Sequence, residues 1–145
     1  MNKNTVAKVT ISIEATKGKV WEALVTPEAI KQYMFGTNVE SDWSKGSKIT
    51  WKGEMNGKKY ADKGVILAIE PDQKLQYSHF SPLAGQPEKP ENYHTVTFNL
   101  SDSGNKTEVS LTQDNNSDEK ERKESEGNWG SMLDSLKKYV EKAAS

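Results

Sequence analysis

The C-terminal segment carries an apolar stripe, and this stripe constrains the fold more than any other feature. Its residues recur at spacings of three and four, which places them on one side of an α-helix. Burying such side chains stabilises a protein by about 1.5–3 kcal/mol each, so the helix requires an apolar surface on which to dock. The stripe consists of Trp129, Met132, Leu133, Leu136, Tyr139 and Val140.

Alternating segments elsewhere in the chain supply that surface. Val9, Ile11 and Ile13 alternate with polar residues, which is typical of a strand that is buried on one face. Between residues 37 and 112 short segments rich in β-branched and aromatic residues alternate with turn signals, which predicts antiparallel hairpins. The predicted strands span residues 48–51, 59–70, 74–80, 93–100 and 107–113.

Glycines and prolines mark the ends of these elements. Thr16 is placed to cap one short helix, and Pro27 is placed at the first position of a second helix, which Gly36 ends. Asn56-Gly57 is the strongest hairpin signal, and Gly64 predicts a bulge in the long strand. Residues 81–92 contain three prolines and predict a mobile surface loop that could act as a lid.

Gly127 and Gly130 flank Trp129 inside the helical pattern, where each glycine costs about 1 kcal/mol relative to alanine. Two explanations are open. Either the helix begins only at Trp129, or the missing side chains leave space between the helix and the sheet.

The composition favours one domain that spans residues 1–145. A chain of 145 residues with 33% hydrophobic residues supports one core but not two. A net charge of −1, with no basic run, argues against a nucleic-acid partner. The absence of a membrane span, of a signal peptide and of cysteine indicates a cytoplasmic protein without disulfides.

Residues for catalysis or metal binding are few. His79 and His94 are the only histidines, and no metal-binding or nucleophile motif surrounds them. Only pairing across neighbouring strands could bring them together, and ordinary histidines at the rim of a sheet are favoured over catalytic or metal-binding ones. We therefore expect no catalytic residue, no metal site and no cofactor, and we favour a non-enzymatic protein.

Aromatic residues are the better functional lead, since four tryptophans and five tyrosines stand in a chain poor in apolar residues. They either form the core or line an apolar pocket, and both roles are compatible. The candidate lining residues lie on the short second helix, on the strands and on the long helix. They are Tyr33, Phe35, Trp51, Tyr60, Tyr77, Trp129, Leu133 and Leu136.

Several segments, taken in their order and spacing, match a known family. They are residues 20–24 and 26–30, 64–66 and 69–71, 95–98 and 107–111, and 127–129 with Leu133, Leu136 and Tyr139. Together they resemble the AHSA-like family, named for the activator of the ninety-kilodalton heat-shock protein's ATPase, within the START-like SRPBCC superfamily. The resemblance covers nearly the whole chain. It implies an α+β helix-grip fold, like that of the birch-pollen allergens, in which a curved antiparallel sheet with two short helices grips a long C-terminal helix.

Three functions follow as hypotheses. The first is binding of a small hydrophobic molecule, such as a lipid, a flavonoid or a polyketide-like compound, in a cavity between the sheet and the C-terminal helix. The second is a co-chaperone-like interaction module with a chaperone partner. The third is a cyclase- or hydrolase-type enzyme of the superfamily, which would require His79, His94 or a buried carboxylate inside the cavity. The sequence does not fix the oligomeric state.

Overall fold

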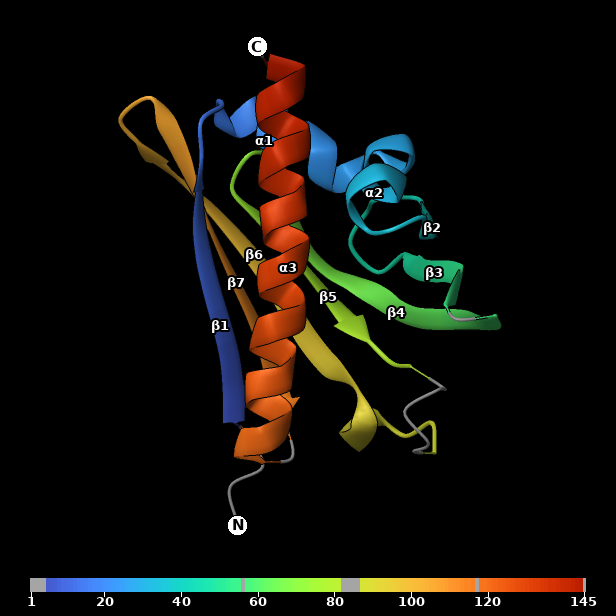
Figure 1. Ribbon diagram of the computed structural model, residues 1–145. Helices are drawn as coiled ribbons and strands as arrows, with labels where there is room; N and C mark the ends of the chain where they lie inside the picture. Colours follow the sequence, from blue (N-terminus) through green and yellow to red (C-terminus); the bar gives the residue numbers. More distant parts are fainter. Residues whose placement is uncertain (1–4, 56, 82–86, 117, 145) are drawn as a thin grey trace.

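A computed structural model describes residues 5–55, 57–81, 87–116 and 118–144. In this part of the chain seven antiparallel strands form one sheet in the order β1-β7-β6-β5-β4-β3-β2 (Figure 1). The strands are β1 (Thr5–Ile13), β2 (Asn38–Ser41), β3 (Lys48–Met55), β4 (Lys58–Glu70), β5 (Lys74–His79), β6 (His94–Ser103) and β7 (Lys106–Asn116).

The long helix α3 (Glu119–Ala144) runs along one face of the sheet, close to β1 (Figure 1). Two short helices, α1 (Lys17–Val25) and α2 (Pro27–Tyr33), contact the long helix and each other, and α2 also contacts β2. A single turn of 3-10 helix, η2 (Pro90–Asn92), precedes β6. The predicted helix-grip fold is confirmed: a curved antiparallel sheet with two short helices holds the long C-terminal helix.

The core lies between α3 and the inner face of the sheet. Leu133 and Leu136 on the helix are completely buried, as are Ile66 on β4 and Leu111 on β7. The polar chain therefore concentrates its few apolar residues in one layer, as the predicted stripe requires.

The short helices begin as the sequence predicts. The hydroxyl of Thr16 accepts a hydrogen bond from the backbone N–H of Lys19 at 3.4 Å, and Pro27 occupies the first turn of α2. Gly36 has a φ of +89°, which suits a residue just beyond a helix end.

The strand predictions hold with shifted ends, and β2 is an additional short strand. Of the predicted hairpin signal, Asn56 lies outside the described residues, but Gly57 has a φ of +81° and the flanking strands pair up to Met55 and Lys58. Residues 82–86 of the predicted loop also lie outside the described part of the chain.

Gly64 is required by a close approach of two backbones. A Cβ atom at this position would lie 1.7 Å from the carbonyl oxygen of Ser78 on β5. The register irregularity in this pair of strands falls slightly further along, between Ile66 and Ala68.

The first explanation of the helix glycines is wrong, and the second stays a prediction. The helix begins at Glu119 and runs through both positions, so it does not start at Trp129. A Cβ at Gly127 would meet nothing within 4 Å, and one at Gly130 would touch only Val9, at 4.0 Å. Packing against the sheet therefore does not require glycine at either position.

Side chains of α3 form hydrogen bonds with outward backbone groups of the edge strand β1 and of Glu14, the residue that follows it. Glu126 accepts a hydrogen bond from the N–H of Lys8 at 3.0 Å, and Glu141 accepts one from Glu14 at 2.8 Å. Lys137 donates to the carbonyl oxygen of Ser12 at 2.8 Å. The bond from Lys8 is the main cause that lowers the pKa of Glu126 below its ordinary value.

No helix in the described residues has the length and apolar character that a membrane crossing needs.

Candidate functional site

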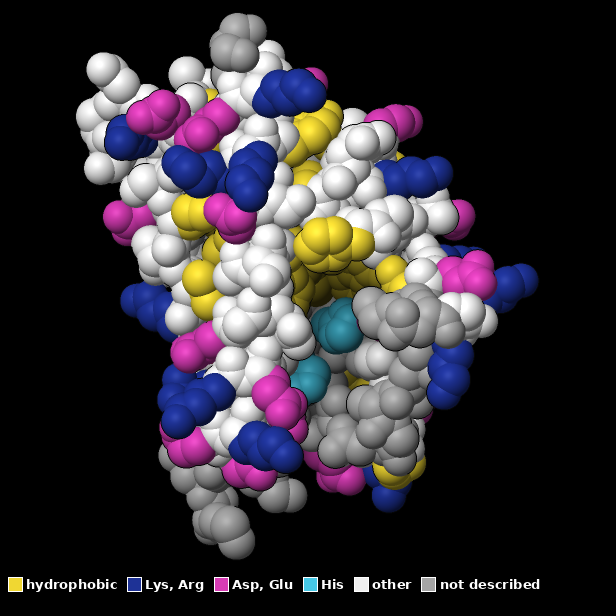
Figure 2. All heavy atoms as spheres, in the orientation of Figure 1, with side chains coloured by type: hydrophobic (Ala, Val, Ile, Leu, Met, Phe, Trp, Pro, Cys, Tyr) yellow, Lys and Arg dark blue, Asp and Glu magenta, His cyan; other side chains and the backbone are white. Residues whose placement is uncertain are grey.

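An open cavity of about 240 Å³ lies between the N-terminal half of α3 and the ends of β5, β6 and β7. Figure 2 shows a hollow to the right of α3, with hydrophobic side chains in its depth and the histidine side chains at its edge. Phe80 and Trp129 contribute rings to the wall. The polar lining includes His79, His94, Gln113, Ser125 and Asn128.

The two histidines are direct partners across strands β5 and β6. Cross-strand partners place their side chains on the same face of the sheet, with Cβ atoms about 5 Å apart. The period-two pattern explains why both face the helix: His79 continues the row of Leu75 and Tyr77, and His94 begins the row of Val96 and Phe98.

His79 is held by a carboxylate on the neighbouring strand. Its Nε2 lies 3.0 Å from Oδ2 of Asp62, and because a carboxylate only accepts, Nε2 carries the proton and donates it. The imidazole also packs edge-on against Trp51, with 5.0 Å between ring centroids. In the neutral ring, Nδ1 is therefore the acceptor, and it has no hydrogen-bond partner among the described residues.

His94 is held in the opposite tautomer. Its Nδ1 lies 2.9 Å from the backbone carbonyl oxygen of Asp114, which can only accept, so Nδ1 carries the proton. Nε2 lies 4.0 Å from Oε1 of Glu121, which is beyond hydrogen-bond distance. The neutral ring of His94 therefore presents Nε2 as an acceptor.

The Asp62–His79 pair has the form of a base oriented by a carboxylate. Oδ1 of Asp62 is buried and has no hydrogen-bond partner in the described structure. Within the described residues no three His, Cys, Asp or Glu side chains gather in a way that could hold a metal ion. The arrangement can accept a proton or a hydrogen bond at its edge.

A polar network fixes Trp129 at the cavity wall. Its indole Nε1–H donates to Oε1 of Gln113 at 2.5 Å, and the amide of Gln113 donates to Ser125 and Asn116, each at 3.3 Å. Ser125 donates in turn to Asn116 at 3.0 Å. Because Gln113 and Asn116 are buried on β7, this network sets the position of the first turns of α3.

The space beneath the middle of α3 is almost completely filled. Its void has a volume of only about 20 Å³, which is room for about one water molecule. Trp51 lies 4.9 Å from Tyr77 between ring centroids, and Tyr77 lies 6.2 Å from Phe98. This aromatic cluster meets the open cavity at His79, which contacts Trp51, and at Trp129, which contacts Phe98 at 6.3 Å.

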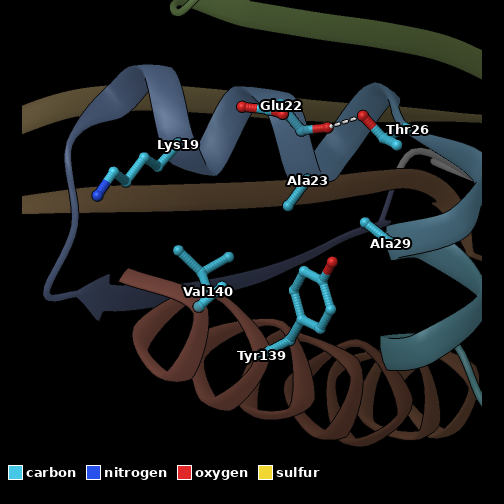
Figure 3. A pocket seen from close by; sticks show the side chains of 8 residues that line it. Lys19, Glu22, Ala23, Thr26, Ala29, Tyr139 and Val140 are labelled. Carbon is cyan, nitrogen blue, oxygen red and sulfur yellow. Dashed lines mark hydrogen bonds between the residues drawn. The ribbon is translucent and has the colours of Figure 1, made fainter. Parts of the chain in front are cut away.

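A second open cavity of about 220 Å³ lies between α1, α2 and the C-terminal end of α3 (Figure 3). Its wall includes Ala23, Ala29, Tyr139 and Val140. Its charged groups, Lys19 and Glu22, are exposed, and no interaction with a described residue fixes them. The cavity beside the histidines is the stronger candidate because its polar groups are half-buried and oriented.

The structure distributes the predicted lining residues among several different environments. Tyr33, Trp51 and Tyr77 surround the small inner void, and Trp129 lines the open cavity. Leu133 and Leu136 are completely buried in the core. Tyr60 packs over Gly53 and its hydroxyl lies 2.5 Å from that of Thr37, whereas Phe35 is 72% exposed on the surface.

Several polar residues of the open cavity were not among those predicted from the sequence: His79, His94, Gln113, Ser125 and Asn128. The signal for the histidines was present, because each continues the inward row of its strand. No local signal marks Gln113 or Ser125, since their role depends on how α3 meets β7.

The family model described as Activator of Hsp90 ATPase homolog 1-like protein matches residues 14–141. The chain belongs to this family. A protein from Cytophaga hutchinsonii with a solution structure is similar to it over 99% of both chains, with 56% identity and a TM-score of 0.86. No curated protein matches the chain.

More distant structures share the fold of this activator-like chain. The Aha1 dimer from Colwellia psychrerythraea is 22% identical, with 94% of this chain and 96% of the other covered and a TM-score of 0.75. Ara h 8.0201 is 10% identical, with 94% and 97% covered and a TM-score of 0.74. The family and its helix-grip fold suggest a ligand-binding or co-chaperone-like module.

Proposed function

We propose that this protein binds a small hydrophobic molecule of the lipid, flavonoid or polyketide-like classes between the sheet and α3, without chemical conversion. The observation that carries the proposal is the open cavity of about 240 Å³, which combines aromatic walls with oriented polar groups. Ligand sites in proteins are concave and mostly apolar and hold a few placed polar groups.

The volume limits the size of the ligand. Typical sites for drug-sized molecules measure about 300–1,000 Å³, so this open cavity suits a ligand of about two fused rings. A longer ligand would have to displace Trp51 or Tyr77 from the filled interior, at the cost of their packing. A compact ligand is therefore the form that the cavity favours.

The predicted lining residues take four different roles in this proposal. Trp129 contacts the ligand directly, while Tyr33, Trp51 and Tyr77 form an inner wall with which His79 is continuous. Leu133 and Leu136 support that wall from the core. Tyr60 and Phe35 belong to the outer region around β3 and α2 and contact the ligand only if that region closes over it.

A filling variant tests the proposal. Asn128 lines the cavity and is exposed, so Asn128→Trp should fill the opening without disturbing the core. Lys123→Trp introduces the same side chain on an exposed position of the same helix outside the lining. Titration with naphthol, followed by proton–nitrogen NMR, should shift the indole signal of Trp129 in the parent and in Lys123→Trp but not in Asn128→Trp.

The opposite result is equally clear. If naphthol and a panel of lipids, flavonoids and polyketides shift no signals and raise no melting temperature, the chain is not a binder of this kind, because a ligand specific for the folded state must stabilise it.

A co-chaperone-like module is the second candidate, and the exposed Phe35 supports it. This large apolar side chain is 72% exposed and has a φ of +55°, an unfavourable conformation for such a residue. If a chaperone binds here, Phe35→Ser should abolish its capture, while Val6→Ser, at another exposed apolar residue, should not. A chaperone ATPase rate that the protein leaves unchanged would argue against this candidate.

A further inference from the structure

The geometry points to a ligand that carries a hydrogen-bond donor, and specifically to a phenolic hydroxyl. Its single proton is donated to one of two ring nitrogens that have no hydrogen bond to a described residue, Nδ1 of His79 or Nε2 of His94. This inference rests on the proposed function and specifies the ligand class. It separates the proposed ligand classes, because phenolic flavonoids and polyketides carry such donors whereas fatty acids carry a carboxylate.

Two fixed tautomers create the acceptors. Asp62 accepts a hydrogen bond from the Nε2–H of His79, and the backbone carbonyl of Asp114 accepts one from the Nδ1–H of His94. Each neutral imidazole has one donor and one acceptor nitrogen, and in both rings the donor is already engaged by the protein. What remains at the cavity edge is therefore a pair of acceptors, one from each of two adjacent strands.

The charges around the cavity disfavour an anion. No Lys or Arg is among the described lining residues, and the two carboxylates of Asp62 and Glu121 stand near the histidines. Lys63, on β4 beside Phe80, is paired with Glu88. A bound carboxylate would lose its hydration without gaining a counter-ion, which is costly.

The walls favour a flat ligand. Phe80 is buried and stacks on Tyr93 with 5.2 Å between ring centroids and an interplanar angle of 28°. The ring of Trp129 is fixed by Gln113. The aromatic wall residues Phe80 and Trp129 suit a planar aromatic body, which a phenol provides.

Three matched probes test the inference at about pH 8, where imidazole is ordinarily neutral and a phenolic hydroxyl keeps its proton. They are naphthol, its methyl ether and naphthoate, substituted at the same ring position. Dissociation constants from NMR titration should show naphthol binding about tenfold more tightly than the ether, because only naphthol can donate. Naphthoate should bind more weakly than the ether.

Variants assign the preference to the histidines. His79→Phe and His94→Phe keep a ring of similar size and remove one acceptor each. The variant that removes the nitrogen bonded to the hydroxyl should reduce the ratio of the two constants toward one. The ratio is measured within each variant, which cancels effects on stability. If His79→Phe fails to fold, D62L/H79F removes both members of the pair and leaves no buried carboxylate without a partner.

Each outcome is decisive. A preference for naphthol that one of the variants abolishes supports the inference. Equal binding of naphthol and the ether, or a preference that survives both variants, overturns it and leaves the proposed function standing. Tighter binding of naphthoate also overturns it. If none of the three probes binds, the inference falls, and the panel of lipids, flavonoids and polyketides then decides the proposed function.

Discussion

Asp62 on β4 accepts a hydrogen bond from Nε2 of His79 on β5 at 3.0 Å, while its other oxygen is buried and has no partner among the described residues. The carboxylate thus has a single hydrogen bond to the described part of the chain, and that bond determines which nitrogen of His79 carries the proton. The chemical character of the cavity edge therefore depends on a residue that does not line it.

The two histidine tautomers should be directly observable. Long-range proton–nitrogen NMR should show His79 protonated at Nε2 and His94 protonated at Nδ1 at about pH 8. In Asp62→Ala the Nε2 proton of His79 loses its acceptor, so its signal should broaden by exchange with water, while the signals of His94 should not change. A sharp Nε2 proton signal in the variant would contradict the role of Asp62.

Gly64→Ala should destabilise the protein severely. The added Cβ would meet the carbonyl oxygen of Ser78 at 1.7 Å, so β4 and β5 must separate. We expect a loss of about 3 kcal/mol or more in the free energy of unfolding, measured with urea. A loss below about 1 kcal/mol would show that the strands yield easily.

Gly127→Ala should stabilise the protein. The position is exposed within α3 and an added Cβ meets nothing within 4 Å, so the variant gains helix propensity without a clash. The expected gain in the free energy of unfolding is about 0.5–1 kcal/mol. Gly130→Ala should gain similarly, and a loss in both variants would mean that the helix interior needs these glycines.

The protein should lose stability in alkali through two buried tyrosines. Burial raises the pKa of Tyr33 and of Tyr77 well above the ordinary value. Above about pH 10 the unfolded tyrosines release protons that the folded ones retain, so the free energy of unfolding falls by about 1.4 kcal/mol per pH unit for each. Below that pH the contribution is fully present.

Urea unfolding between about pH 9 and pH 12 measures this slope. Tyr77→Phe should reduce it, since phenylalanine does not titrate, while Tyr60→Phe, at a half-buried tyrosine, serves as the comparison. An unchanged slope in Tyr77→Phe would show that this hydroxyl already ionises normally in the folded state.

Trp129→Phe should lower the free energy of unfolding by more than the loss of ring volume alone explains. The change removes the indole donor and leaves Oε1 of the buried Gln113 without that hydrogen bond, which adds about 1–3 kcal/mol to the cost. Trp43→Phe makes the same exchange at a half-buried tryptophan whose indole N–H has no hydrogen bond to a described residue. Equal losses of unfolding free energy in the two variants would show that the hydrogen bond of Trp129 to Gln113 adds no stability.

Periodicity predicted most of the fold, because burying one face of a helix or strand requires apolar residues at the spacing of that element. The stripe from Trp129 to Val140 and the alternation of Val9, Ile11 and Ile13 each identify one buried face, and both elements appear where the pattern places them. The start of the helix stayed open between two explanations because residues 119–128 are polar. Their stability comes from capping and ion pairs such as Arg122 with Glu119 and Glu126.

The candidate site was harder to predict because it depends on distant pairings. Asp62 and His79 come together only through the register of β4 and β5, and His94 joins them only through β6. The size of the interior void was also unpredictable, since an aromatic-rich sequence is compatible with either an open or a filled space. Whether the space is open or filled depends on how the side-chain volumes fit together, and a pattern of hydrophobic residues does not give that fit.

The contacts of Glu126, Lys137 and Glu141 with the backbone of β1 have a consequence for assembly. An exposed edge strand is a template on which another chain can add a strand. Here the long helix already engages the outward groups of Lys8, Ser12 and Glu14, so extension of the sheet from this side would first require α3 to detach. The helix that covers the core thereby also serves as the barrier to growth of the sheet at β1.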